Sequence, residues 1–348
     1  MSDRPLVLVA RRLPAPVMRR LADRCEVRVH DGEGAIPRDR LLREVAGVRG
    51  AITLLTERVD DELLAAAGAE LAIVANYAVG FDNVDVAACT RRRVMVSNTP
   101  DVLTEATADM AWALMLAAAR RVAEGDRSLR TRTPWIWGPE MMLGRDVAGA
   151  TLGIVGFGRI GQAVARRARG FGMRVLYNGR RPVAPEVEAE LGASFRADLD
   201  DLLAESDFVS LHVSLGPDTH HLIDAGRLAR MKPTGVLVNT ARGPVVDEAA
   251  LAEALERGTI LAAGLDVFER EPEVDQRLLG LRNAVLAPHL GSATVDTRVA
   301  MGMVAVDNLF AALEGRRPPT LLNPEAWEAR RWRQADGAGG DGGSGDNR

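Results

Sequence analysis

Arg242, Glu271 and His289 each follow a short apolar stretch of strand character. If these stretches are parallel strands, their carboxyl ends meet at one edge of a sheet, where ligands of open α/β proteins bind. An arginine holds a carboxylate through two parallel hydrogen bonds, and a histidine donates protons near neutral pH. A glutamate beside that histidine favours the protonated ring and fixes its orientation. Together the three residue types suit hydride transfer to an α-keto acid.

A glycine-rich loop precedes these residues, between the predicted strand Leu152–Val155 and a segment of helical composition, 162–168. Gly156 permits a tight turn, Gly158 lets the backbone approach a pyrophosphate, and Gly161 lets helix and strand pack closely. The predicted phosphate-binding residues are Gly156, Phe157, Gly158, Arg159, Ile160 and Gly161. This pattern predicts a dinucleotide site with its phosphates at the helix N-terminus.

The end of the next predicted strand, Arg174–Tyr177, bears on which dinucleotide binds. An NAD site of this type places an acidic residue about 20 positions after the glycines, where it binds the ribose hydroxyls. The chain has Asn178, Gly179, Arg180 and Arg181 at that place. Guanidinium groups pair with a 2′-phosphate, which a carboxylate would repel. We therefore expect NADP(H) to be preferred and NAD(H) to be a second option; the alternative is a solvated basic turn.

Two blocks of alternating strand-like and helix-like segments must position these residues. The alternation predicts an α/β protein with two parallel-sheet domains, Rossmann-like and flavodoxin-like, and an active-site cleft between them. We expect residues 1–100 and 288–325 to form a substrate (catalytic) domain and residues 101–287 a dinucleotide-binding domain. The expected strands are Pro5–Ala10, Glu26–His30, Gly50–Leu55, Leu71–Ala75, Val94–Ser97, Leu152–Val155, Arg174–Tyr177, Phe208–Val213, Val236–Asn239, Ala262–Val267 and Ala284–Leu286. A last helix, Thr294–Leu313, is expected to return to the first domain.

The first block lacks a glycine fingerprint, but its fourth strand runs into the loop Asn76–Asp82. Loops at the carboxyl ends of such strands form the ligand crevice, so Val79 and Gly80 could offer backbone N–H groups to an anion. A plain turn is an equal alternative. Between the blocks lie a predicted helix, Thr104–Arg120, and a proline-framed loop with Trp135 and Trp137. Tryptophans in such a loop indicate an interface or a pocket wall, the alternative being that they cap a core.

Composition narrows the class of protein. The net charge of −4 argues against a nucleic-acid partner, and the longest apolar run, Met110–Ala119, is too short to span a membrane. Cys25 and Cys89 are far apart and lie in no metal-ligand pattern, so we expect free thiols, no metal site and a cytoplasmic protein. The Gly- and Asp-rich tail, 334–348, is expected to be disordered.

Four motifs make the chain resemble the D-isomer-specific 2-hydroxyacid dehydrogenase family over about residues 5–320. They are Gly156-x-Gly158-x-x-Gly161, Asn239-Thr-Ala-Arg242-Gly243, Gly264-Leu-Asp266-Val-Phe-x-x-Glu271-Pro272 and Pro288-His289-x-Gly291-Ser-Ala-Thr294. The loop 76–85 and the turn 178–181 look most like the glyoxylate/hydroxypyruvate reductase branch. The proline of the family's frequent His-x-Pro-Leu-Thr is absent from His212–Gly216, which puts exact carry-over there in doubt.

The resemblance implies roles for residues at matching positions. Arg242 would clamp the substrate's carboxylate and carbonyl, Glu271 would be the partner of His289, and His289 would be the acid/base. The substrate would also meet Val79, Gly80 and Trp137, the last from a neighbouring subunit of a homodimer. Further cofactor contacts are expected at Thr107, Thr240, Asp266 and Gly291.

The leading hypothesis is an NADPH-dependent reductase of small 2-keto acids to D-2-hydroxy acids, of the glyoxylate/hydroxypyruvate type. A 2-ketogluconate-type or other D-2-hydroxyacid dehydrogenase is an alternative, because the motifs do not fix the length of the pocket. A dinucleotide-sensing binding protein on the same fold is a third hypothesis, less favoured because Arg242, Glu271 and His289 are all present.

Overall fold

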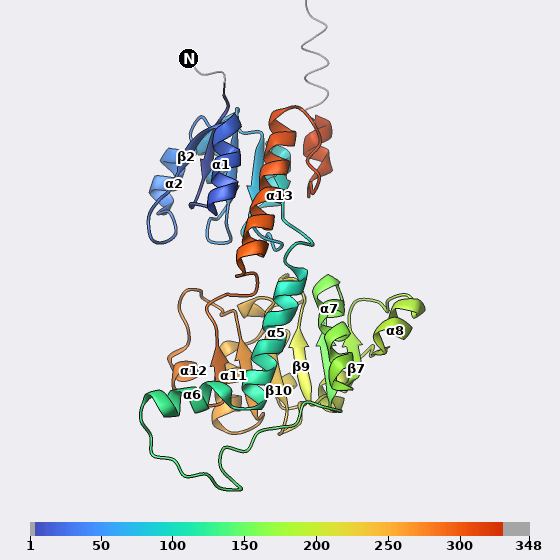
Figure 1. Ribbon diagram of the computed structural model, residues 1–348. Helices are drawn as coiled ribbons and strands as arrows, with labels where there is room; N and C mark the ends of the chain where they lie inside the picture. The colour runs from blue at the N-terminus through green and yellow to red at the C-terminus, as the bar shows by residue number, and fades with distance from the viewer. Residues whose placement is uncertain (1–3, 330–348) are drawn as a thin grey trace, which may run out of the picture. The chain divides into compact units, whose positions relative to one another are not determined.

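The computed structural model describes residues 4–329, which form two compact units. One unit comprises the residues up to Val102 and those from Thr294 onward, and the other comprises Leu103–Ala293. Each unit is a parallel sheet covered by helices (Figure 1), so the predicted α/β class is confirmed. The substrate and dinucleotide roles assigned to the two parts stay predictions. The tail predicted to be disordered, 334–348, lies outside the described residues.

The first unit has five parallel strands in the order β2-β1-β3-β4-β5, which is the flavodoxin-like order. Its strands are β1 (Leu6–Val9), β2 (Glu26–Val29), β3 (Gly50–Thr53), β4 (Ile73–Asn76) and β5 (Met95–Ser97). Its helices are α1 (Ala15–Arg24), α2 (Arg38–Glu44), α3 (Asp61–Ala67), α4 (Val86–Arg91) and α13 (Val295–Leu313). The central strands β3 and β4 are buried throughout, which explains their continuous apolar sequences.

Helix α13 completes this unit from the far end of the chain. It packs against β3, β4 and α1, and Thr294 caps it by accepting the N–H of Thr297. Leu309 lies so close to the sheet that a Cβ on Gly50 would be 2.4 Å from its Cδ1 atom. In addition, Asn323 accepts the N–H of Val96 at 2.8 Å. Residues from both ends of the sequence therefore build one sheet-and-helix layer.

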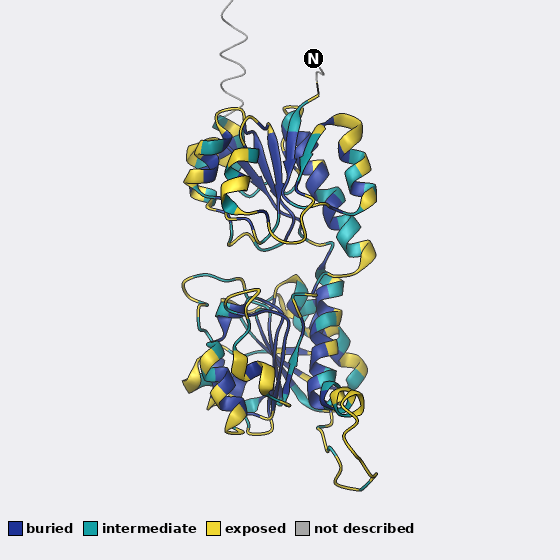
Figure 2. Cartoon of the chain, turned by 90° about the vertical axis from the view of Figure 1, so that its left-hand side faces the viewer, coloured by how far each residue is buried: buried dark blue, intermediate teal, exposed yellow. Residues whose placement is uncertain are grey.

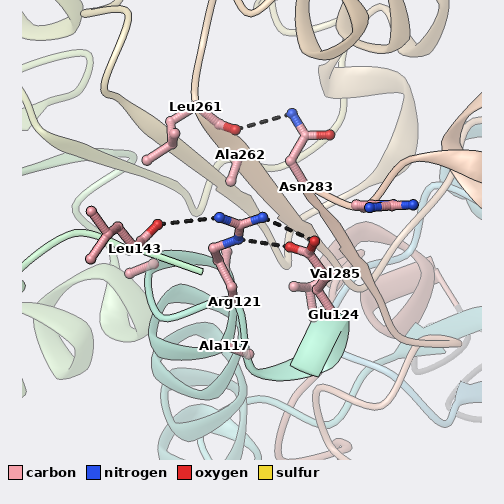
Figure 3. A pocket seen from close by; sticks show the side chains of 12 residues that line it. Ala117, Arg121, Glu124, Leu143, Leu261, Ala262, Asn283 and Val285 are labelled. Carbon is pink, nitrogen blue, oxygen red and sulfur yellow. Dashed lines mark hydrogen bonds and ion pairs between the residues drawn. The ribbon is translucent and has the colours of Figure 1, made fainter. Parts of the chain in front are cut away.

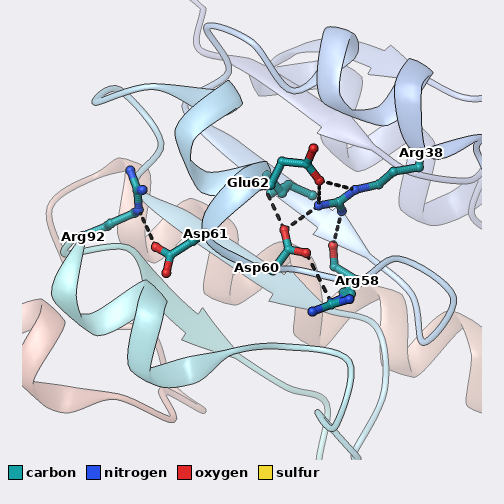
Figure 4. Close-up of polar contacts among 7 residues, drawn as sticks. Arg38, Arg58, Asp60, Asp61, Glu62 and Arg92 are labelled. Atoms are coloured by element: carbon teal, nitrogen blue, oxygen red, sulfur yellow. Dashed lines mark hydrogen bonds and ion pairs between the residues drawn. The ribbon is translucent and has the colours of Figure 1, made fainter.

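Ion pairs join α2, α3 and α4 on the surface of the first unit (Figure 4). Arg38 contacts both Asp60 and Glu62, while Asp61 accepts from Arg92 at 2.9 Å. Asp60 also caps α3 by accepting the N–H of Leu63 at 3.0 Å. Exposed pairs of this kind contribute about 0–1 kcal/mol each, so the cap and the buried core matter more to the unit's stability.

The second unit has seven parallel strands in the order β12-β11-β10-β9-β6-β7-β8, whose reversal between β6 and β9 is that of a Rossmann fold. The strands are β6 (Thr151–Val155), β7 (Arg174–Asn178), β8 (Ala193–Phe195), β9 (Phe208–Leu211), β10 (Val236–Asn239), β11 (Ala262–Leu265) and β12 (Ala284–Leu286). The helices are α5 (Thr104–Ala119), α6 (Val122–Arg130), α7 (Arg159–Ala168), α8 (Pro185–Leu191), α9 (Leu199–Glu205), α10 (Ala225–Leu228), α11 (Glu248–Glu256) and α12 (Gln276–Gly280), with 3₁₀ turns η1 (Arg169–Phe171) and η2 (Gly243–Val245).

Alternate residues of these strands enter two cores, one on each face of the second sheet. Ile154 and Val238 belong to the core beneath α5 and α7, whereas Val155 and Leu237 belong to the core beneath α9 and α11. Figure 2 shows the buried strands between helices whose outer faces are exposed. Eleven strands were predicted and are found within a few residues of their expected bounds, whereas the short edge strand β8 was not predicted.

Candidate active site

The glycine loop joins β6 to α7, and two of its glycines are required by the backbone. Gly156 has a φ of +92°, and a Cβ added there would lie 2.5 Å from the carbonyl oxygen of His212. A Cβ on Gly161 would lie 2.3 Å from the carbonyl oxygen of Gly156. At Gly158 an added Cβ would meet nothing within 4 Å in the described chain, so this backbone is open to a ligand.

The helix that follows has an N-terminus suited to an anion. Gly158 is its N-cap, no side chain caps it, and Arg159 and Ile160 form its first turn. Uncapped amides and the helix dipole together attract phosphate groups. Phe157 is buried, and its ring stacks on Tyr177 with 4.0 Å between the ring centroids. This aromatic contact holds the loop together with Gln162, whose side-chain amide donates to the Phe157 carbonyl at 3.1 Å.

The turn after β7 presents two arginines to solvent. Asn178 donates its side-chain amide to the carbonyl oxygen of Arg196 at 2.8 Å, and its own carbonyl accepts the N–H of Gly156 at 2.9 Å. Within residues 4–329 the exposed side chains of Arg180 and Arg181 make no hydrogen bond or ion pair. Gly179 separates them from Asn178. Both guanidinium groups are thus available to a phosphate at this end of the loop.

Two other arginines of this part of the sheet are already paired: Arg174, the first residue of β7, and Arg196, which directly follows β8. Arg174 and Arg196 both contact Glu205. The hydrogen bond from Arg196, which has the larger effect, and that from Arg174 lower the pKa of this carboxyl to about 2. Arg180 and Arg181 differ from these two arginines in having no such partner among residues 4–329.

The loop after β10 holds Arg242 through its backbone. Asn239, the last residue of β10, accepts the N–H of Ala241 at 3.0 Å and donates to the carbonyl of Arg242 at 2.9 Å. A Cβ on Gly243 would lie 1.9 Å from the backbone carbonyl atoms of Phe268. Only glycine permits this approach, which places the loop carrying Arg242 against the segment that leads to Glu271.

Four predicted cofactor residues lie at the carboxyl ends of β10 to β12 and on α5. The buried Asp266 accepts the N–H groups of Leu290 and Gly291 at 2.6 and 2.7 Å. A Cβ on Gly291 would lie 3.5 Å from Thr107, so these residues are neighbours. The buried hydroxyl of Thr240 has no hydrogen-bond partner in the described chain, and a bound cofactor would supply one. Burial raises the pKa of Asp266, against the effect of the two amides and of His289.

Glu271 and His289 form the predicted pair. The Nδ1 atom of His289 lies 2.7 Å from Oε2 of Glu271, while Oε1 of Glu271 accepts the N–H of Phe268 at 3.0 Å. The two side chains are 32% and 35% exposed, so the ring is partly accessible at the surface of this unit. With Nδ1 engaged, Nε2 is the ring nitrogen left for proton transfer. His289 itself has a φ of +55°, fixed by N–H bonds to the carbonyls of Asp266 and Ala287.

The charge of the pair follows from its surroundings. Burial would raise the pKa of the Glu271 carboxyl, but the hydrogen bond and charge of His289, the Phe268 amide and the charge of Arg242 outweigh it. The pKa of Glu271 is therefore lowered, and this group is a carboxylate at neutral pH. His212, by contrast, bonds Ser210 and has its pKa lowered to about 3 by desolvation, so it stays neutral and does not serve as the acid.

In the first unit, Val79 and Gly80 offer two adjacent backbone donors. Their carbonyl oxygens are occupied by the side-chain amides of Asn98 and Asn76, each at 2.9 Å. Both residues are half-buried, and their own N–H groups meet no acceptor within residues 4–329. This arrangement favours the anion-binding interpretation of the loop over a plain turn.

Trp137 is not brought to this rim within one chain. The side chains of Trp135 and Trp137 are 59% and 79% exposed, so they do not cap a core. Their loop leaves and rejoins the unit at the amino-terminal edge of the sheet, where Arg145 donates its N–H to the carbonyl of Ala119 (Figure 1). The predicted catalytic residues lie at the carboxyl-terminal edge, so the predicted role of Trp137 at the substrate would require a second subunit.

A cavity of about 250 Å³ also lies at the amino-terminal edge, where α5, α6 and the starts of β11 and β12 meet (Figure 3). Arg121 crosses it, bonded to Glu124 at 2.7 and 2.9 Å and to the carbonyl of Leu143 at 3.4 Å. Because the glycine loop and His289 are at the opposite edge, this cavity is not the predicted nucleotide site.

The sequence reasoning missed the residues that hold the site in place. Asn76 and Asn239 each end an apolar strand and organise the loop that follows, and Asn98 does the same for Val79. A polar residue closing a buried strand is the signal that could have identified them. The sequence around Glu248 gives no comparable signal.

No group of three or more His, Cys, Asp or Glu residues suited to a metal occurs within the described range, and none of its helices is long and apolar enough to span a bilayer.

Comparison with known proteins gives a consistent result. Residues 112–291 match the model of the D-isomer specific 2-hydroxyacid dehydrogenase NAD-binding domain. The chain is 52% identical over 332 residues to the glyoxylate reductase of Thermococcus onnurineus, covering 94% of this chain and 98% of that one. It is 49% identical over 332 residues to the glyoxylate reductase of Pyrococcus furiosus, with the same two coverages.

Solved structures agree in fold. An NADPH-dependent glyoxylate/hydroxypyruvate reductase of Sinorhizobium meliloti, in complex with NADP and malonate, is 36% identical with a TM-score of 0.79, over 93% of this chain and 98% of that one. A protein of Thermus thermophilus is 48% identical with a TM-score of 0.85, over 91% and 99%. With the glycine loop, Arg242 and the Glu271–His289 pair all in one unit, the chain belongs to the D-isomer-specific 2-hydroxyacid dehydrogenase family and is an oxidoreductase of 2-hydroxy acids.

Proposed function

We propose that the protein is a cytoplasmic NADPH-dependent reductase of glyoxylate and hydroxypyruvate that forms D-2-hydroxy acids. The observation that carries the proposal is the Glu271–His289 pair at the same sheet edge as Arg242 and the glycine loop. Relatives named glyoxylate reductase, about 50% identical over most of the chain, support the choice of substrate.

The cofactor would be held by residues that fit its parts. Phosphates would lie against Gly156–Gly161 and the start of α7, and the 2′-phosphate against Arg180 and Arg181. The buried hydroxyl of Thr240, which has no hydrogen-bond partner among residues 4–329, would bond a polar group of the cofactor. Asp266, Thr107 and Gly291 would flank the nicotinamide half. When bound, NADPH supplies the hydride.

The chain's own residues would do the rest. Arg242 would bind the substrate carboxylate and stabilise the negative charge that develops on the carbonyl oxygen. In the first unit, the N–H groups of Val79 and Gly80 are donors suited to a carboxylate. His289 would give its Nε2 proton to that oxygen, and the Glu271 carboxylate would stabilise the protonated ring and fix it through Nδ1.

A homodimer is part of the proposal. Trp135, Ile136 and Trp137 form an exposed apolar segment, 59%, 88% and 79% exposed, which a second subunit would cover. We propose that Trp137 then reaches the substrate of the neighbouring subunit, because its loop is at the wrong edge of the sheet to reach the substrate of its own.

The test is NADPH oxidation by the purified protein with a panel of keto acids, followed by chiral analysis of the product. The panel is glyoxylate, hydroxypyruvate, pyruvate and 2-ketogluconate. Turnover of the first two above the others, with D-glycerate formed from hydroxypyruvate, is expected. A preference for 2-ketogluconate would replace the proposed substrate class, and dinucleotide binding without turnover would favour a sensor. Light scattering of the same sample gives the oligomeric state.

A further inference from the structure

One side chain outside the proposed active site holds both ends of the loop that carries Glu271. Glu248, the first residue of α11, accepts the N–H of Glu269 on Oε2 and the N–H of Asp275 on Oε1, each at 2.8 Å. The first of these amides precedes Glu271 in the chain and the second follows it. Its carboxylate therefore closes the loop 269–275 at the base.

The rest of the loop transmits this closure to the catalytic pair. Above the base, Glu273 donates its N–H to the carbonyl of Arg270 at 2.9 Å, which makes a tight turn around Glu271. At the tip, Glu271 uses one oxygen for the N–H of Phe268 and the other for His289. A shift of the base would thus change the direction in which Glu271 meets the imidazole.

Glu248 is well suited to fix this base. It is half-buried, and both of its carboxylate oxygens accept a backbone N–H. Hydrogen bonds to a charged acceptor are about twice as strong as neutral ones. Catalytic groups have to be held within about 0.5 Å of their working geometry. The side chain belongs to the first turn of α11, whose N-cap is Asp247, so the carboxylate that holds the loop is itself attached to a rigid helix.

We propose that Glu248 is a positioning residue for the acid/base pair. It acts through Glu271 on the orientation and protonation of His289, and it touches neither the substrate nor the cofactor. The inference rests on the proposed function, because it requires that His289 transfers the proton.

The experiment compares Glu248→Gln and Glu248→Ala with the control Glu253→Gln. Glu253 lies on the same helix, is exposed and pairs with Arg257 at 2.7 Å, so the control makes the same change of charge without touching the loop. We expect Glu248→Ala to lower kcat for glyoxylate about tenfold, or about 1.4 kcal/mol. In a plot of the reduction rate against pH, the decline on the alkaline side should also move to lower pH. Glu248→Gln keeps one acceptor oxygen and should be intermediate. The Kd of NADPH should change less than twofold in every variant.

A double-mutant cycle with Glu271→Gln separates positioning from general loosening. If Glu248 acts through Glu271, Glu248→Gln should lower kcat less than twofold further once Glu271 is replaced. The inference would be overturned if the losses of kcat from Glu248→Gln and Glu271→Gln were additive. It would also be overturned if Glu248→Ala were fully active, or if it lowered kcat without moving the pH–rate profile. If Glu248→Ala does not fold, the cycle with Glu248→Gln alone decides. Absence of keto-acid turnover by the wild type would instead overturn the proposed function.

Discussion

Replacing Glu271 by Gln removes the negative charge beside His289 and keeps a side chain of the same shape. The pKa of Glu271 is lowered in the folded protein, so the group is ionised throughout the working range and favours the protonated ring. Reduction needs that proton, and its rate should fall as pH rises through the midpoint for loss of the proton. Oxidation of the hydroxy acid needs the neutral ring and should rise over the same range. Without the charge of Glu271, the fall of the reduction rate and the rise of the oxidation rate, here called the two limbs, should both move to lower pH.

The geometry of the Glu271–His289 contact determines the size of this shift. The atoms are 2.7 Å apart, which is a short charge-assisted hydrogen bond, but the side chains are 32% and 35% exposed. Buried bonds to charged groups contribute about 1.5–3 kcal/mol, and exposed ion pairs about 0.2–1 kcal/mol. An intermediate value of about 1.4 kcal/mol corresponds to about one pH unit. We therefore expect both limbs to move down by about one unit while activity at low pH is retained.

The assay is kcat against pH in both directions for wild type and Glu271→Gln. Deuterated NADPH should give a kinetic isotope effect, which establishes that hydride transfer limits the rate. His289→Ala is the reference for loss of the acid and should lower kcat by about 10²–10⁴ with NADPH binding retained. If the pH–rate profiles of Glu271→Gln coincide with those of the wild type while the isotope effect is present, the contact between Glu271 and His289 has no part in the chemistry.

Three further variants test other parts of the site. Arg180→Ala with Arg181→Ala should lower kcat/KM for NADPH at least about tenfold, roughly 1.4 kcal/mol, and spare NADH; equal loss with both cofactors would contradict the 2′-phosphate assignment. Arg242→Lys keeps the charge but loses the two-pronged donor, so kcat/KM for glyoxylate should remain as low as in Arg242→Ala, and near-normal kinetics would remove Arg242 from the site. Gly243→Ala would place a Cβ 1.9 Å from the Phe268 backbone, so thermal unfolding should show a loss of about 1–3 kcal/mol together with a lower kcat; an unchanged Tm would show that the two loops separate easily.

The strands and the glycine loop were predictable because their causes are local. Apolar runs such as Gly50–Thr53 and Val236–Asn239 become strands buried on both faces, and a glycine at a φ of +92° is marked by its residue type. The edge strand β8 was not predictable in this way. It has three residues, one of them exposed, so its sequence carries little hydrophobic pattern.

The site was predictable only as far as residue type indicates chemistry. His289, Glu271 and Arg242 are recognisable because imidazole, carboxylate and guanidinium have characteristic roles. The residues that position them are not, since Glu248 acts through two backbone N–H groups that are distant in sequence. Its partners become neighbours only after α11 and the 269–275 loop have packed, and no spacing rule connects them.

Because the first unit is built from both ends of the chain, its sheet is synthesised long before the helix that covers it. Its sheet is complete at Ser97, but the helix that covers β3 and β4 begins at Val295, after all of Leu103–Ala293. At about 5–20 residues per second, the ribosome takes roughly 10–40 seconds to make that insert. During this interval the apolar face of β3 and β4 lacks the helix that covers it, so the first unit cannot complete its core until the second unit has been synthesised.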